Sequence, residues 1–193
     1  MQRVYIQGER EKVYHYDKIS HYILGQFKMI IQEAVDSDFN KIWPIFHEIA
    51  STGETYAYPT DISKDKAKKL WMDLPRKTFI VVDNGSVIGT YYIKTNQSGP
   101  GSHVCNCGYM VSSQARGKGI ATMMCEHSQN VALELGYKAM QFNFIASSNT
   151  GAIELWNKLG FKTVGTLPKA FNHPKLSYID ALVMYKWLDD INN

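Results

Sequence analysis

Two glycines, Gly117 and Gly119, stand at the start of an expected helix, directly after an expected strand. Apolar residues recur at helical spacing over residues 117–135, and two basic side chains, Arg116 and Lys118, flank the first glycine. Backbone N–H groups in the first turn of a helix lack helical partners, and the helix dipole makes this end positive. Because glycine leaves these N–H groups uncovered, the pattern predicts a diphosphate-binding turn, with a solvated basic helix start as the alternative.

The other elements are expected to form a mixed α/β sheet that positions this turn, with strands first in hairpins and then alternating with helices. Asn84-Gly85 is typical of a type I′ turn between two of these strands. The expected strands are 28–34, 78–82, 87–93, 103–111, 139–145, 161–166 and 178–187, and the expected helices are 39–49, 63–71, 117–135 and 149–159. Residues 1–26 are expected to be an N-terminal extension that adds an edge strand or hairpin to a domain over residues 27–193.

The composition is that of a soluble globular domain. The chain has 193 residues, of which 45% are hydrophobic and 20% are charged. No apolar run approaches the roughly 18 residues of a membrane span, and the N-terminal residues lack the apolar core of a signal peptide. A net charge of +3 without long Lys/Arg runs argues against a nucleic-acid partner. We therefore expect a cytoplasmic protein with neither a membrane nor a nucleic-acid partner.

Three cysteines, Cys105, Cys107 and Cys125, are expected to be buried thiols in a reducing compartment. The first two lie two residues apart on one expected strand, so both point to one face and cannot easily bridge each other. A zinc site would need a second pair of ligands at a suitable spacing, which the sequence does not contain. No metal is therefore expected.

Two ordered motifs resemble the GNAT family of acyl-CoA N-acyltransferases. Residues 114–119 resemble the signature Q/R-x-x-G-x-G/A, and residues 149–161 resemble the later block N-x-x-A-x-x-L-Y-x-x-x-G-F. The resemblance extends from about Lys28 to Trp187. It implies a central twisted mixed sheet flanked by helices, in which the fourth and fifth strands splay apart and the pantetheine arm of acetyl-CoA lies in the gap.

Three further segments are similar to one subgroup of this family. The loop 53–59 and the closing strands 165–180 are similar to phosphinothricin-type acetyltransferases. Asn106 and the pair Phe142-Asn143 are similar to acetyltransferases that detoxify azetidine-2-carboxylate, a proline analogue. The resemblance therefore implies a small amino acid or analogue as the acceptor.

The resemblance also implies which residues bind acetyl-CoA as co-substrate. Backbone groups of Met110 and Val111 would bind the pantetheine, and Asn149 would reach it from the next helix, a position where Asn is also a good N-cap. Trp156 stands where relatives often carry a Tyr that protonates the leaving thiolate, so it is expected either to steady the sulfur or to pack in the core. The amides expected to hold the pyrophosphate are those of Arg116, Gly117, Lys118, Gly119, Ile120 and Ala121.

On the acceptor side, Asn106 occupies the position at which many relatives place a Glu as general base. Because Asn does not accept a proton at neutral pH, a direct carboxylate base is not expected. Asn106 and Asn143 are the expected catalytic residues, holding the substrate carboxylate and ordering a water; the alternative is that they are amides bridging two splayed strands. Glu54, Tyr56, Tyr58 and Phe144 are the remaining expected substrate contacts.

The expected function is transfer of an acetyl group from acetyl-CoA to the amine of a small amino acid, by direct attack in a ternary complex. Acetylation of a protein or peptide is the nearest alternative. A non-catalytic acyl-CoA sensor on the same scaffold is the alternative from another class, because a fold does not fix a function. By analogy with relatives, a homodimer is expected.

Overall fold

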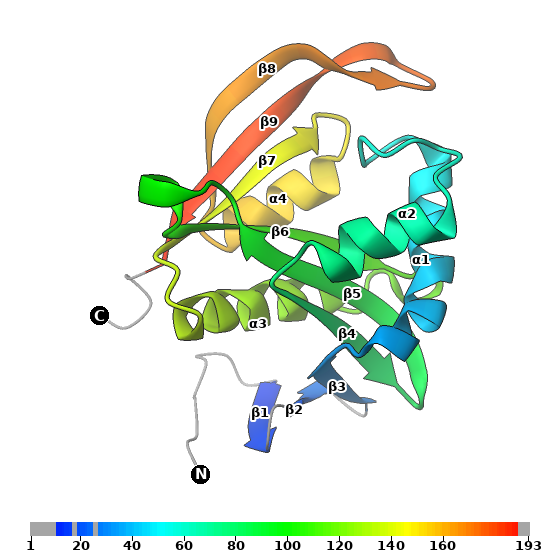
Figure 1. Ribbon diagram of the computed structural model, residues 1–193, viewed down its shortest axis with the longest axis vertical. Coiled ribbons are helices and arrows are strands. Elements are labelled where there is room, and N and C mark those ends of the chain that lie inside the picture. Colours follow the sequence, from blue (N-terminus) through cyan, green and yellow to red (C-terminus); the bar gives the residue numbers. More distant parts are fainter. Residues whose placement is uncertain (1–10, 17–18, 25–26, 189–193) are drawn as a thin grey trace.

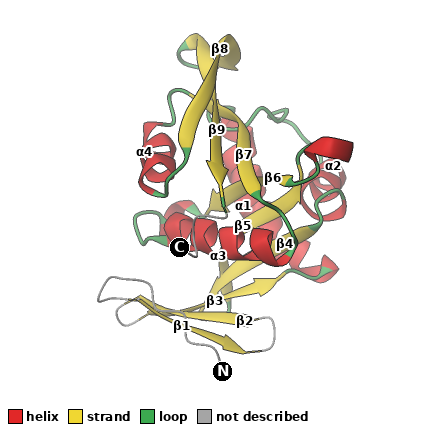
Figure 2. Cartoon of the chain, turned by 90° about the vertical axis from the view of Figure 1, so that its left-hand side faces the viewer, coloured by secondary structure: helices red, strands yellow, loops and turns green. Residues whose placement is uncertain are grey.

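The computed structural model describes residues 11–16, 19–24 and 27–188, which build one nine-stranded sheet with the order β1-β2-β3-β4-β5-β6-β7-β9-β8 (Figure 1). The hairpin of β8 and β9 lies at one end of the molecule, and β1 and β2 lie at the other (Figures 1 and 2). The strands are β1 (Glu11–Tyr16), β2 (Ile19–Leu24), β3 (Phe27–Glu33), β4 (Lys77–Asp83), β5 (Ser86–Thr95), β6 (Val104–Val111), β7 (Ala139–Ala146), β8 (Lys162–His173) and β9 (Ser177–Trp187).

Helices cover both faces of the sheet, and the alternation of side chains along the strands divides the core between them. On β4, Phe79 and Val81 pack in the cluster that contains α3 and α4, whereas Ile80 between them packs in the cluster of α1 and α2. The helices are α1 (Phe39–Thr52), α2 (Lys64–Lys68), α3 (Ile120–Glu134) and α4 (Thr150–Lys158), with a single π-helical turn, Lys69–Asp73, after α2. Within the described residues, no helix is long and apolar enough to cross a membrane.

The strands from β3 to β6 are antiparallel neighbours. The turn between β4 and β5 contains Asn84 and Gly85 with φ of 47° and 80°, which confirms the predicted hairpin and its positive backbone angles. Beyond β3, the sheet continues through β2 to β1, both antiparallel, so that residues 11–16 and 19–24 extend its edge.

The two central parallel strands, β6 and β7, pair at only two positions before they separate. Val104 lies opposite Ala139 and Cys105 opposite Met140, and no later pair joins these strands. On its other edge, β7 pairs with β9 from Ala139 to Ala146. A gap therefore opens toward the carboxyl ends of β6 and β7, which confirms the predicted splay.

Candidate active site

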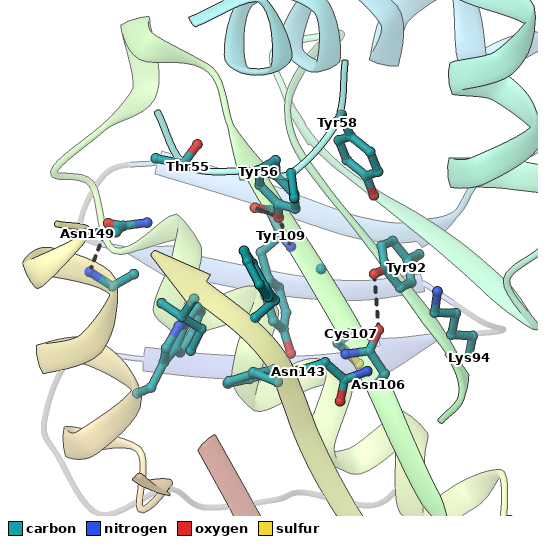
Figure 3. Close-up of a pocket in the computed structure, with 17 residues that line it drawn as sticks. Thr55, Tyr56, Tyr58, Tyr92, Lys94, Asn106, Cys107, Tyr109, Asn143 and Asn149 are labelled. Carbon is teal, nitrogen blue, oxygen red and sulfur yellow. Dashed lines mark hydrogen bonds between the residues drawn. The ribbon is translucent and has the colours of Figure 1, made fainter. Parts of the chain in front are cut away.

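A cavity of about 310 Å³ lies where β6 and β7 diverge (Figure 3). Strands β5, β6 and β7 form its floor and walls, α4 contributes from one side, and residues 55–58 of the loop between α1 and α2 lie across it. The lining residues are Thr55, Tyr56, Ala57, Tyr58, Tyr92, Lys94, Asn106, Cys107, Gly108, Tyr109, Phe142, Asn143, Phe144, Ile145, Asn149, Ala152 and Trp156. A cavity of this size suits a small molecule.

A bulge in β7 places two of the predicted substrate contacts at the cavity. Phe142 pairs with Met184 of β9 and Ile145 pairs with Leu182, so β7 has one more residue than β9 over this stretch. A β-bulge of this kind bends the strand and re-aims its side chains. Asn143 and Phe144, the two residues inside the bulge, both line the cavity and are both exposed.

Asn106 is buried and joins the two splayed strands. Its Nδ2 donates to the carbonyl of Gln141 on β7 at 2.9 Å, and its Oδ1 accepts from the hydroxyl of Tyr92 on β5 at 3.1 Å. Tyr92 fits here because its cross-strand neighbour is Gly108, where a Cβ would lie 2.6 Å from Tyr92 Cε1. Asn106 thus makes the amide bridge that was one predicted alternative, while it also lines the cavity required by the other.

Asn143 continues this amide network toward solvent. Its Oδ1 accepts from Nε2 of Gln141 at 2.8 Å, and its Nδ2 donates to Oδ1 of Asn96 at 2.6 Å. The network therefore runs from β6 through β7 to the segment after β5, along one wall of the cavity. Each side-chain amide nitrogen carries two N–H donors, so one donor of Asn106 and one of Asn143 are left for a ligand.

Tyr56 ties the covering loop to the free edge of β6. Its hydroxyl donates to the carbonyl of Tyr109 at 2.7 Å and accepts from the N–H of the same residue at 2.9 Å. The ring of Tyr56 stacks on that of Tyr58, with centroids 5.4 Å apart. Burial raises the pKa of Tyr56 well above its ordinary value and that of Tyr58 to about 12, so both hydroxyls are protonated at neutral pH.

The hydrogen-bond pattern of β6 determines which backbone groups face the gap. The N–H of Ser112 bonds to Ile88 of β5, whereas the backbone of Tyr109 bonds to the covering loop. Because backbone groups alternate in direction along an antiparallel strand, Val111 faces the gap together with Tyr109, and Met110 faces β5. The backbone groups of Met110 therefore point to β5, and those of Val111 point to the gap where the pantetheine arm is expected.

The glycine turn after β6 also differs from the prediction in one respect. Gly117 and Gly119 have φ of 76° and 74°, a left-handed conformation that glycine adopts without steric cost. The helix therefore begins at Ile120, with Gly119 as its N-cap, rather than at residue 117. The glycines form a loop ahead of the helix, and the N–H groups of the first turn, which include those of Ile120 and Ala121, remain the donors that a helix leaves unpaired.

Two predicted cofactor contacts lie on α4. Asn149 is the N-cap, its Oδ1 accepting from the N–H of Ala152 at 3.4 Å, and it lines the cavity as well (Figure 3). Trp156 also lines the cavity, but its ring packs among aromatic side chains, 5.1 Å from Tyr109 and 5.0 Å from Phe142 between centroids. Its environment is that of a core residue.

Glu54, a predicted substrate contact, does not line the cavity. Its carboxylate forms an ion pair with Lys175, in the turn between β8 and β9, and this partner lowers the pKa of Glu54. The carboxylate therefore links the covering loop to the hairpin at the end of the sheet.

The lining residues that sequence reasoning did not assign to the site include Tyr92 and Lys94. They alternate along β5 and so share one face, a signal that the sequence does carry. Their position beside Asn106 depends on the register between β5 and β6, in which Lys94 lies opposite Asn106.

Lys94 is the one charged side chain among the lining residues, which include no Asp, Glu or His. Burial raises the pKa of the lining thiol Cys107 well above its ordinary value, so the sulfur is a neutral thiol. In the part of the chain that the structure describes, no group of His, Cys, Asp and Glu residues is arranged to hold a metal ion.

Comparisons with known sequences place these features in a family. The profile of the acetyltransferase (GNAT) family matches residues 38–161. The N-acetyltransferase aca1 of Schizosaccharomyces pombe is 36% identical over 99 residues, which cover 51% of this chain and 47% of that protein. The chain thus matches about half the length of this curated relative.

Solved structures give the same result. A GCN5-related N-acetyltransferase from Kribbella flavida is 39% identical, with a TM-score of 0.79 over 83% of this chain and 98% of that one. A phosphinothricin acetyltransferase from Sinorhizobium meliloti, solved in complex with acetyl-CoA, is 21% identical with a TM-score of 0.73, over 82% of this chain and 87% of that one. The second likeness shows the fold alone. With a family profile that spans more than half of its residues, the chain belongs to the acetyltransferase (GNAT) family.

Proposed function

We propose that this protein transfers the acetyl group of acetyl-CoA to the amine of a small amino acid or a close analogue. The observation that carries the proposal is the partly open cavity at the divergence of β6 and β7, lined by amide and hydroxyl groups and without a carboxylate.

The residues around the end of β6 support the binding of acetyl-CoA as the acetyl donor. Val111 presents a strand edge to the gap, which suits the amides of a pantetheine arm. Gly117 and Gly119 form an open turn ahead of α3, and the positive end of that helix suits a diphosphate. These residues fit acetyl-CoA, which supplies the activated acetyl group as a thioester. A related fold from Sinorhizobium meliloti holds the same molecule.

The acceptor side is supported by the size and cover of the cavity. Tyr56 and Tyr58 lie across it as a stacked pair, and the hydroxyl of Tyr56 fastens this cover to Tyr109. A cover of this kind suits a small ligand, whereas a peptide or protein acceptor needs an open groove. The covered cavity therefore favours a small acceptor.

The chemistry that these residues support is direct attack by the amine. The acceptor nitrogen bonds to the thioester carbonyl carbon, the carbon–sulfur bond breaks, and the nitrogen loses a proton to water. A thiol with a pKa of about 8.5 leaves readily as the thiolate near neutral pH, so Trp156 need not act as an acid. Cys107, held as a neutral thiol by burial, is unsuited to a covalent acetyl-enzyme.

The proposal is tested by following thiol release from acetyl-CoA with a panel of amines. The panel contains azetidine-2-carboxylate, L-proline, hydroxyprolines, phosphinothricin, polyamines and N-terminal peptides. We expect turnover with one or more of the amino or imino acids. Turnover on peptides alone would overturn the proposed acceptor class, and binding of acetyl-CoA without turnover of any amine would favour the sensor.

A further inference from the structure

A single ammonium group faces the cavity. Lys94, on β5, lies opposite Asn106 in the strand register and lines the cavity (Figure 3). Its Nζ lies 5.3 Å from the centroid of the Tyr92 ring, and this cation–π contact holds the side chain beside the buried amide of Asn106. Lys94 is half-buried, and no carboxylate among the described residues forms an ion pair with it.

We propose that Lys94 determines acceptor specificity by binding the carboxylate of the substrate, so that the enzyme accepts free amino or imino acids and rejects their neutral carboxamides. This inference rests on the proposed function, because it names the chemical group by which the acceptor is selected.

The neighbouring donors show why Lys94 is the residue that carries this selection. Asn106 and Asn143 each use one amide N–H within the protein, on Gln141 and Asn96. The ammonium of Lys94 has three donors and a full positive charge, and its interaction with an anion is stronger than that of a neutral amide. A carboxylate at this end of the cavity completes the site, with the remaining amide donors as additional partners.

The charge of the cavity also orients the acceptor. A second cation, such as the far amine of a polyamine or a lysine side chain, would be repelled by Lys94. No lining carboxylate is present to hold the reacting amine as an ammonium ion. A substrate with its carboxylate toward Lys94 therefore keeps its amine away from the Lys94 ammonium group, and no lining carboxylate stabilises the protonated amine.

The test compares each free acid that the enzyme uses with its own carboxamide, for example L-proline with L-prolinamide. In Lys94→Gln we expect KM for the acid to rise at least about tenfold, with kcat changed far less, since a charge-assisted hydrogen bond is lost. The ratio of kcat/KM for acid over amide should fall by a similar factor, a comparison that cancels the intrinsic reactivity of each amine. Lys94→Arg should retain most of the preference because it keeps the charge.

The matched control is Lys162→Gln, which removes an exposed lysine at the start of β8, outside the cavity lining. This variant should leave KM and kcat for the acid unchanged. KM for acetyl-CoA should be unchanged in all variants. An acid-to-amide ratio that is the same in the wild type and Lys94→Gln would overturn the inference while leaving the acetyltransferase function standing.

A binding measurement distinguishes failure of the Lys94 inference from failure of the proposed acetyltransferase function. If the wild type acetylates no amine, calorimetric titration with L-proline and L-prolinamide still tests Lys94. Binding of the acid that is lost in Lys94→Gln would support the carboxylate site and overturn the acetyltransferase function. Equal binding of both compounds, or binding of neither, would overturn the inference.

Discussion

The hydroxyl of Tyr56 occupies both backbone groups of Tyr109, accepting from its N–H at 2.9 Å and donating to its carbonyl at 2.7 Å. Fifty-three residues separate the two tyrosines along the chain. A side chain from the covering loop thus fills a place on the free edge of β6 that the backbone of β7 would occupy in a continuous sheet. The same two hydrogen bonds therefore fasten the covering loop and satisfy the backbone groups of Tyr109 on the free edge of β6.

Replacing this hydroxyl should destabilise the protein. In Tyr56→Phe the ring remains but the N–H and the carbonyl of Tyr109 lose their partner, and a buried polar group without a partner costs about 1–3 kcal/mol. We expect the free energy of unfolding, measured with urea, to fall by that amount. Tyr178→Phe is the control, because Tyr178 is 63% exposed and its hydroxyl lies at the surface. If both variants unfold alike, water replaces the hydroxyl of Tyr56 and the bond does not hold the loop.

The glycine turn before α3 should matter both for stability and for acetyl-CoA. Gly117→Ala forces a side chain into a left-handed conformation, at a cost of about 1–2 kcal/mol, without a steric clash, since no atom lies within 4 Å of the added Cβ. We expect lower stability and a KM for acetyl-CoA raised several-fold, with the acceptor KM little changed.

Gly85→Ala provides a matched control for that variant. Gly85 has a φ of 80° and equally open space, but it lies in the turn between β4 and β5. It should show the same loss of stability and an unchanged KM for acetyl-CoA. Equal kinetic effects in the two variants would show that the turn at Gly117 acts only through folding.

The order of elements could be predicted from the sequence because local patterns carry it, whereas the splay of β6 and β7 was predicted only from the resemblance to the GNAT family. Alternation defines the strands, and Asn84-Gly85 defines a hairpin. The start of α3 could not be placed in the same way. Apolar periodicity over 117–135 does not report the sign of φ. Because Gly117 and Gly119 have positive φ, the helix begins at Ile120, three residues after the predicted start.

The predicted site was less complete than the fold because its geometry depends on contacts between distant segments. Lys94 comes beside Asn106 only through the register of β5 and β6. The direction of the Met110 backbone depends on which residues of β6 bond to β5, which no side-chain pattern reveals. Glu54 does not line the cavity and forms an ion pair with Lys175, more than a hundred residues further along the chain.

Asn143 allows substrate binding to be separated from structural bridging. It is exposed, so Asn143→Ala should change the free energy of unfolding by less than about 0.5 kcal/mol, although it removes the hydrogen bonds to Asn96 and Gln141. If Asn143 contacts the acceptor, KM for the acceptor should rise while KM for acetyl-CoA stays constant. Unchanged acceptor kinetics would contradict the substrate role and leave the amide network as its only function.

The pH dependence of the reaction should follow the substrate rather than the protein. The cavity contains no lining carboxylate or histidine, and burial raises the pKa of Cys107 and of the tyrosines Tyr56, Tyr58 and Tyr92. None of these groups gains the ability to accept a proton near neutral pH. The reactive form of the acceptor is the neutral amine, whose fraction rises tenfold with each pH unit below the amine's own pKa.

We therefore expect kcat/KM for the acceptor to rise from about pH 6 to pH 9 with a slope close to one on a logarithmic plot. With acceptors of different amine pKa, the pH at which the curve levels off should move with the amine. A bend at one fixed pH between 6 and 8 for every acceptor would reveal a protein group that acts as general base, and would contradict direct attack by an amine that loses its proton to water.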